Sequence, residues 1–119
     1  MKLALKKIGL GCVLGCLTLT SVQAVVMTQQ VTIQDYQYVP ANITITPGTT
    51  VIWTNKDSVA HTVTATNHSW DSGDLPPGAT YSHQFKATGT YPYLCTYHTD
   101  MSGVVTVLGA PNPVNRTAQ

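Results

Sequence analysis

Charge is scarce in this chain, and long apolar runs are absent from most of it. Only 9% of its 119 residues are charged, with six Lys and Arg against five acidic side chains. No basic cluster occurs beyond the first seven residues, which argues against a nucleic-acid-binding surface. After position 24, apolar residues alternate with Thr, Ser and Gln and never form the run of about 20 that a transmembrane helix needs. The sequence therefore predicts one small domain with no nucleic-acid partner and no membrane span.

The first 24 residues form a separate segment. Three lysines precede the apolar stretch Ile8–Leu19, and a Val-Gln-Ala sequence follows it and ends at Ala24. This order is typical of a secretory signal peptide that is cleaved after Ala24. The apolar stretch is too short to span a bilayer as a helix. Lipoprotein processing at Cys16 is the less favoured alternative, because little of the apolar stretch lies before that cysteine.

Cysteine is scarce once this leader is removed. Cys12 and Cys16 leave with the leader, so Cys95 is the lone cysteine that remains and cannot form an intramolecular disulfide. In a secreted protein, such a thiol is a buried core residue without a chemical role, a partner in an intermolecular disulfide, or a metal ligand or nucleophile. The count alone leaves these alternatives open.

Strand signals dominate the remaining residues, and no helical stripe appears among them. Short β-branched or alternating runs are separated by turn residues at roughly 8- to 12-residue spacing. The runs are Val31–Ile33, Ile43–Ile45, Val51–Trp53, His61–Ala65, Tyr81–Phe85, Tyr91–Cys95 and Val104–Leu108. We expect a loop over Asn67–Gly78 and a flexible tail over residues 110–119. The pattern predicts an all-β fold, a Greek-key β-sandwich of about seven to eight strands, in a single domain over residues 25–109.

Side-chain alternation places two reactive residues inside this sandwich. Successive side chains of a strand point to opposite faces, so His61 shares a face with Val63, and Cys95 shares one with Tyr93. Both His61 and Cys95 are therefore expected to point inward. The two histidines that we interpret as structural are His68 and His83.

The segment from Cys95 to Met101 concentrates metal-binding groups. Cys95, His98 and Met101 follow one another at three-residue intervals. Thiolate and thioether ligands select copper, and two His with one Cys and a weak axial Met form the blue-copper electron-transfer site. The second imidazole must come from elsewhere, and His61, on an inward face upstream, can supply it. The sequence therefore predicts a metal site made of His61, Cys95, His98 and Met101.

Each of these residues also has an ordinary explanation. A lone buried His, Met or Cys is usually part of the packed core, but the combined spacing argues against that explanation here. Zinc could bind one Cys and two His, although the thioether argues against zinc. A thiol hydrolase is a poor fit, because such enzymes draw their His from a distant part of the chain, whereas His98 lies beside Cys95. We therefore expect a protein that is not an enzyme.

Longer motifs resemble the cupredoxin family, and most closely its amicyanin and plastocyanin branch. The motifs are Val39-Pro40-Ala41, Pro47–Asn55, Ala60–Val63 and Gly89–Cys95. The resemblance extends over roughly Val31–Leu108, and the Cys-to-Met spacing is similar to that of the short amicyanin ligand loop. It implies one type 1 copper ion, with His61 and His98 as equatorial nitrogen donors, Cys95 as the thiolate donor and Met101 as the axial thioether.

Two features depart from the resembled pattern. Many relatives carry Asn directly after the first ligand His, where it ties the two ligand segments together, and this chain has Thr62 instead. Tyr97 and Thr99 replace prolines of amicyanin-like loops. We expect these replacements to affect the rigidity of the ligand loop, the reduction potential and the exposed docking surface.

The resemblance implies a periplasmic one-electron carrier that cycles between Cu(II) and Cu(I). It places His98 at the surface, where redox partner proteins would dock transiently, and we expect a monomer; the identity of the donor and acceptor does not follow from the sequence. The alternative is a periplasmic copper-binding or copper-delivery protein that uses the same ligands without electron transfer. Copper chaperones usually expose clusters of Met and His, which this sequence lacks. A metal-free structural sandwich would leave the thiol unexplained.

Overall fold

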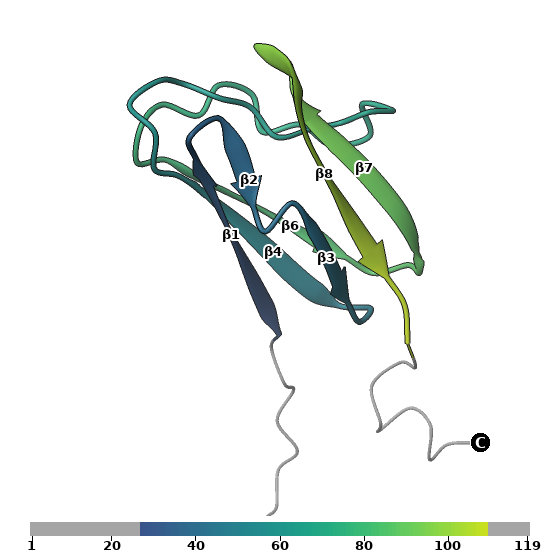
Figure 1. The fold of residues 1–119 in the computed structure, drawn as a ribbon. Helices are drawn as coiled ribbons and strands as arrows, with labels where there is room; N and C mark the ends of the chain where they lie inside the picture. The colour runs from purple at the N-terminus through teal and green to yellow at the C-terminus, as the bar shows by residue number, and fades with distance from the viewer. Residues whose placement is uncertain (1–26, 110–119) are drawn as a thin grey trace, which may run out of the picture.

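The computed structural model describes residues 27–109, which form two four-stranded β-sheets (Figure 1). The strands are β1 (Thr28–Gln34), β2 (Gln37–Val39), β3 (Asn42–Ile45), β4 (Thr49–Asn55), β5 (Thr64–Ala65), β6 (Thr80–Phe85), β7 (Gly89–Cys95) and β8 (His98–Val107). One sheet has the order β2-β1-β4-β6 and the other the order β3-β8-β7-β5. The prediction of an all-β sandwich with seven to eight strands is confirmed.

The chain crosses repeatedly between the two sheets. β1 pairs in parallel with β4, and β3 pairs in parallel with β8, whereas the other strand pairs are antiparallel. The long connection from β4 to β6 runs over the upper end of the sandwich in Figure 1, opposite the ends of the described chain. The tip of the β7–β8 hairpin lies at the same upper end. This arrangement brings the segment of His61 near the segment of Cys95 and His98.

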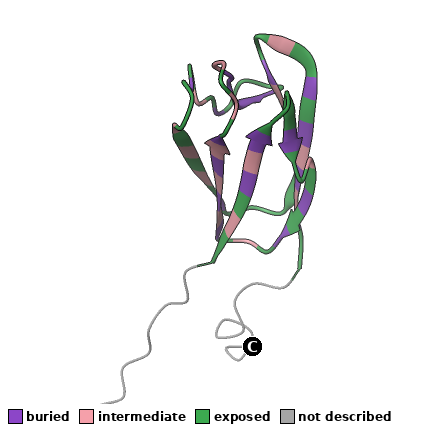
Figure 2. Cartoon of the chain, turned by 60° about the vertical axis from the view of Figure 1, so that its left-hand side comes forward, coloured by how far each residue is buried: buried purple, intermediate pink, exposed green. Residues whose placement is uncertain are grey.

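The core lies between the sheets and is rich in aromatic side chains. β4 alternates strictly between buried and half-buried residues, and Figure 2 shows this banding along the strands. Trp53, which is 0% exposed, packs with ring centroids 5.9 Å from Trp70 and 5.4 Å from Tyr93. Burial of one large apolar side chain stabilises the fold by about 1.5–3 kcal/mol. The aromatic core thereby fixes β7, the strand that ends in Cys95.

The segment that carries His61 is less regular than the alternation predicts. The structure confirms that His61 points inward, at 0% exposed, but residues 61–65 are all buried, and only Thr64–Ala65 belong to a strand. His61 forms an isolated bridge with Leu75. The predicted loop Asn67–Gly78 folds back over this segment, which is why both of its faces are covered. The buried hydroxyl of Thr64 finds an acceptor there, the Asp71 carboxylate at 2.9 Å.

The last strand begins earlier than the sequence predicts. β8 starts at His98 instead of Val104, because Cys95 pairs with His98 across a two-residue turn with a register shift between Leu94 and Cys95. Thr99 is exposed near the hairpin tip and gives no apolar alternation from which a strand could be predicted. His98 and Met101 therefore lie on a paired strand and not on a free loop.

Three of the sequence predictions concern residues that the structure does not describe. The signal peptide over residues 1–24, the alternative processing at Cys16 and the tail over residues 110–119 all lie outside residues 27–109. Within residues 27–109, no helix has the length and apolar character that a membrane crossing would require.

Candidate metal centre

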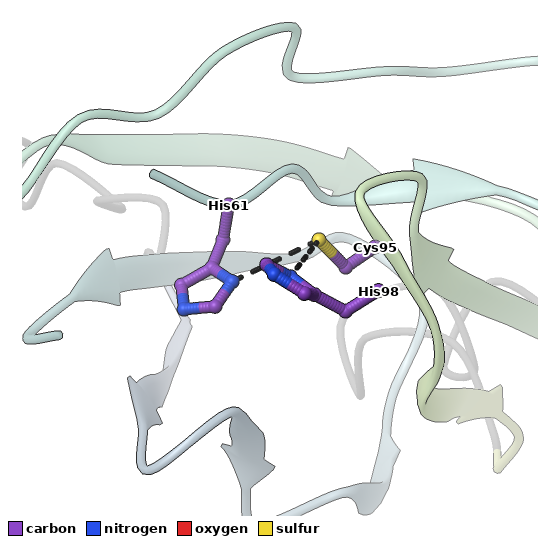
Figure 3. Close-up of side chains that lie close together, drawn as sticks. All are labelled: His61, Cys95 and His98. Carbon is purple, nitrogen blue, oxygen red and sulfur yellow. Dashed lines mark hydrogen bonds between the residues drawn. The ribbon is translucent and has the colours of Figure 1, made fainter. Parts of the chain in front are cut away.

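The side chains of two histidines and one cysteine converge in the structure (Figure 3). The Cys95 Sγ lies 3.8 Å from the Nδ1 of His61 and 3.6 Å from the Nδ1 of His98. The possible ligand atoms of these three side chains all lie within 4.8 Å of one another. His61 and Cys95 are fully buried, and His98 is half-buried. The structure therefore brings together three of the four residues that the sequence selects from distant positions.

The fourth predicted residue, Met101, lies on β8 three positions after His98. It is 4% exposed, whereas Thr99 and Asp100 before it are exposed. Met101 and His98 both line a cavity of about 410 Å³ that opens beside the cluster. The thioether is thus buried on the same strand as one imidazole of the cluster.

The sulfur of Cys95 is buried and is held by a backbone hydrogen bond. Cys95 is free of disulfide bonding and 0% exposed. The backbone N–H of Thr62 donates a hydrogen bond to the sulfur over 3.3 Å. This hydrogen bond links the sulfur to the segment that follows His61.

The spacing of these donor atoms fits a single metal ion. Metal–nitrogen bonds of about 2.0–2.1 Å and a metal–sulfur bond of about 2.3 Å, the lengths known for zinc, place the N and S atoms about 3.8 Å apart at a trigonal angle. The observed separations of 3.6 and 3.8 Å match this value. Thiolate with imidazole, accompanied by a buried thioether, is the donor chemistry that copper prefers.

Comparison with known proteins identifies the family. The sequence profile of the cupredoxin-like domain matches residues 8–107. The chain belongs to the cupredoxin family. It is 34% identical over 83 residues to amicyanin-alpha from Methylorubrum extorquens, a match that covers 66% of this chain and 70% of that protein. It is 32% identical over 81 residues to plastocyanin from Scenedesmus fuscus, over 57% of this chain and 83% of the relative.

Solved cupredoxin structures have the same fold. The novel purple cupredoxin from Nitrosopumilus maritimus superposes with a TM-score of 0.63 and 35% identity, over 67% of this chain and 99% of the other. An oxidised variant of amicyanin superposes with a TM-score of 0.65 and 28% identity, over 68% of this chain and 82% of the other. Copper is the cofactor of this family, and the donor set described above fits it.

In this cupredoxin, Thr62 links the two ligand segments by a hydrogen bond, as Asn does in many relatives. The backbone N–H of Thr96, directly after Cys95, donates to the Thr62 hydroxyl over 2.8 Å. Tyr38 holds the same segment from the other side, because its hydroxyl donates to the Thr62 carbonyl over 2.6 Å. Burial, and after it the nearby Cys95 sulfur, raise the pKa of Tyr38, which keeps its hydroxyl a donor. The two ligand segments are therefore linked without asparagine.

The turn of the β7–β8 hairpin has its own anchor in place of a proline. The hydroxyl of Tyr97 donates to the Asp74 carboxylate over 2.7 Å, although the two residues lie far apart in the sequence. That hydrogen bond is the main reason why the pKa of Tyr97 is raised. The other replaced proline position, Thr99, belongs to β8. The turn is thus anchored by a contact that could not be predicted from the sequence.

Two further residues touch the imidazoles and were missed by the sequence analysis. The Oδ2 of Asp57 lies 2.7 Å from the Nε2 of His61. The ring of Tyr36 packs edge-on against the rings of His61 and His98, with ring centroids 5.2 and 4.8 Å apart. Asp57 is assigned no role in the sequence analysis. Its position four residues before an inward His was the available signal. Nothing in the sequence indicates that Tyr36 lies near the imidazoles, because it belongs to the turn between β1 and β2, far from both histidines in the chain.

The two remaining histidines, which the sequence analysis interprets as structural, lie outside the cluster. His68 is exposed in the connection between β5 and β6. His83 stacks on Trp70 with ring centroids 5.1 Å apart, and burial lowers its pKa. Of the four histidines in the chain, only His61 and His98 join Cys95.

Proposed function

We propose that this cupredoxin carries single electrons between redox partner proteins. In this proposal His61, Cys95 and His98 are the equatorial ligands of one type 1 copper ion, and Met101 is the axial ligand. The observation that carries the proposal is the buried Cys95 sulfur, which lies 3.6 and 3.8 Å from the two imidazole nitrogens. These donor atoms already have the mutual separation of ligands that share one metal ion, so they need to move little to bind it.

In this proposal the protein keeps the ligand atoms in fixed positions while the copper ion changes between Cu(II) and Cu(I). Bound copper supplies the one-electron Cu(II)/Cu(I) couple, and a trigonal donor set with a weak axial ligand suits both states. His61 and Cys95 are 0% exposed and are packed in the sandwich. The hydrogen bonds from Thr62 and Thr96 join their two segments. A site held in this way reorganises little, which favours fast electron transfer.

His98 is the proposed point of electron exchange. It is half-buried, whereas His61 is fully buried, so its ring is the imidazole nearer to a docked partner. Two exposed tyrosines flank it: Tyr36 is 49% exposed and Tyr97 is 51% exposed. Their ring centroids lie 4.8 and 6.4 Å from that of His98. Half-exposed aromatic side chains are common in protein interfaces, which supports transient docking around His98.

We further propose that the protein acts in the periplasm as a monomer. The proposal of a periplasmic location rests on the sequence of residues 1–24, which resembles a cleavable secretory leader. In the mature protein, the domain would then correspond to residues 25–109. The lone buried thiol of Cys95 supports a monomer, because it is not available to form an intermolecular disulfide.

Copper titration tests the proposed ligand set directly. One equivalent of Cu(II) added to the metal-free protein should produce an intense visible band from thiolate-to-copper charge transfer. Further copper should not increase the band, because the described residues hold one such cluster. Copper binding without this band would mean that Cys95 is not a ligand.

The role of Met101 makes a separate prediction. We expect Met101→Leu to retain copper and to raise the reduction potential, because loss of a weak axial donor destabilises Cu(II) more than Cu(I). A tenfold change in the relative affinity for the two states corresponds to about 59 mV for a one-electron couple, and we expect a rise on that order. Voltammetry measures it. A potential that is unchanged or lower would show that the Met101 thioether is not an axial ligand.

A further inference from the structure

A carboxylate stands directly behind the buried imidazole. The Asp57 Oδ2 lies 2.7 Å from the Nε2 of His61, on the opposite side of the ring from the Nδ1 that faces Cys95. The side chain of His61 is 0% exposed and that of Asp57 is only 11% exposed. A short contact between groups so well shielded from water is worth more than a surface ion pair.

The carboxylate is itself held in place by the β1–β2 turn. The backbone N–H of Asp35 donates to Asp57 Oδ1 over 2.7 Å, and the N–H of Tyr36 donates to Oδ2 over 2.9 Å. Both turn residues have positive φ, 55° for Asp35 and 59° for Tyr36. Side chains other than glycine adopt this conformation at a cost, so the contacts with Asp57 help to maintain it. Both oxygens of Asp57 therefore act as acceptors toward this turn, and hydrogen bonds donated to a carboxylate favour its ionised form.

An anionic carboxylate accepts hydrogen bonds and donates none. The nitrogen of His61 that faces Asp57 must therefore carry the proton, which leaves the lone pair on Nδ1. That lone pair faces the Cys95 sulfur, 3.8 Å away. We propose that Asp57 is the positioning residue that fixes the tautomer and orientation of His61 for copper and that lowers the reduction potential of the site. The proposal rests on the proposed function, in which His61 is a copper ligand.

The sign of the effect follows from the charge. A carboxylate that accepts the imidazole N–H makes the opposite nitrogen a stronger donor. A stronger donor, and a nearby negative charge, both stabilise Cu(II) more than Cu(I). Removal of the charge should therefore raise the potential. Loss of such an outer partner typically reduces metal affinity by about 10- to 100-fold.

Asp57→Asn is the test, with Asp35→Asn as its matched control. Asparagine at position 57 offers a single acceptor oxygen to three donors, so the carboxylate's contacts cannot all be kept. Asp35 lies in the β1–β2 turn beside Asp57 and is also an aspartate, but its side chain is exposed and only its backbone N–H contacts Asp57. We expect Asp57→Asn to raise the potential and to weaken Cu(II) binding about 10- to 100-fold, whereas Asp35→Asn leaves both close to wild type. Equal values in the two variants would overturn the proposal.

A second measurement needs neither copper nor a substituted protein. Nitrogen NMR of the metal-free wild-type chain reports which nitrogen of the His61 ring carries the proton. We expect the proton on Nε2, and a proton on Nδ1 would overturn the proposal even if Asp57→Asn failed to fold. The two claims can fail separately. A wild-type protein that binds no copper would contradict the proposed function, whereas the NMR result alone decides how Asp57 acts on His61.

Discussion

Cys95→Ser should abolish the intense visible band of the copper-loaded protein completely. The band requires a sulfur-to-copper charge transfer, and Cys95 carries the only thiol of residues 27–109. A serine hydroxyl is a harder donor that does not share the copper preference of a thiolate. We also expect Cu(II) affinity to fall severely, because one of the three converging donors is lost. Visible absorption spectra at equal copper loading measure the change.

The fold should survive this substitution. The serine oxygen is smaller than sulfur but can still accept the hydrogen bond that the Thr62 N–H gives to the Cys95 sulfur. Thr99→Ser is a suitable control, since Thr99 is exposed on the same hairpin and should leave the band intact. If the band persisted in Cys95→Ser, the copper would be bound elsewhere and the site assignment would be wrong.

Gly103→Ala is expected to give a large loss of stability. Gly103 pairs with Tyr93 across the β7–β8 ladder, and the ring of Tyr93 lies over it. A Cβ atom at this position would lie 2.5 Å from the end of the Tyr93 ring and 2.7 Å from the Ala41 carbonyl oxygen. Tyr93 is 0% exposed and cannot swing away without disturbing the core. Overpacking of this kind costs about 1–3 kcal/mol, and occasionally more.

Thermal unfolding of the metal-free protein measures this cost. In a domain of 60–100 residues, each 1 kcal/mol lowers Tm by about 4–8 °C. Ser102→Ala is the control, because Ser102 precedes Gly103 on β8 but is exposed. We expect Ser102→Ala to change stability by less than about 0.5 kcal/mol. If Gly103→Ala were as stable as that control, the packing of Tyr93 on β8 would be different from the one described.

The donor set could be predicted from the sequence because its residues have few alternative uses. Cys95, His98 and Met101 lie close together in the chain, so their spacing carries information before any fold is known. His61 could be added because the alternation placed it inward, and the structure confirms its burial. Local patterns were sufficient to select these side chains, although His61 and Cys95 lie 34 residues apart in the chain.

The surroundings of the site could not be predicted, because they depend on contacts between distant turns. Tyr36 reaches both imidazoles from the β1–β2 turn, and Asp74 reaches Tyr97 from the long connection between β5 and β6. Nothing in the local sequence of these turns indicates where they meet the ligands. The early start of β8 was missed for a related reason: Thr99 and Asp100 are exposed, so pairing rather than alternation makes them a strand.

Electron self-exchange between the oxidised and reduced copper-loaded protein tests the central claim most directly. NMR line broadening in mixtures of the two forms measures the rate. A site held rigid by the sandwich, with His98 half-buried at the surface, predicts fast exchange together with a chemically reversible one-electron couple. A copper-storage or copper-delivery protein needs neither property. Slow exchange, or loss of copper on reduction, would contradict an electron carrier even if the copper site itself were correctly assigned.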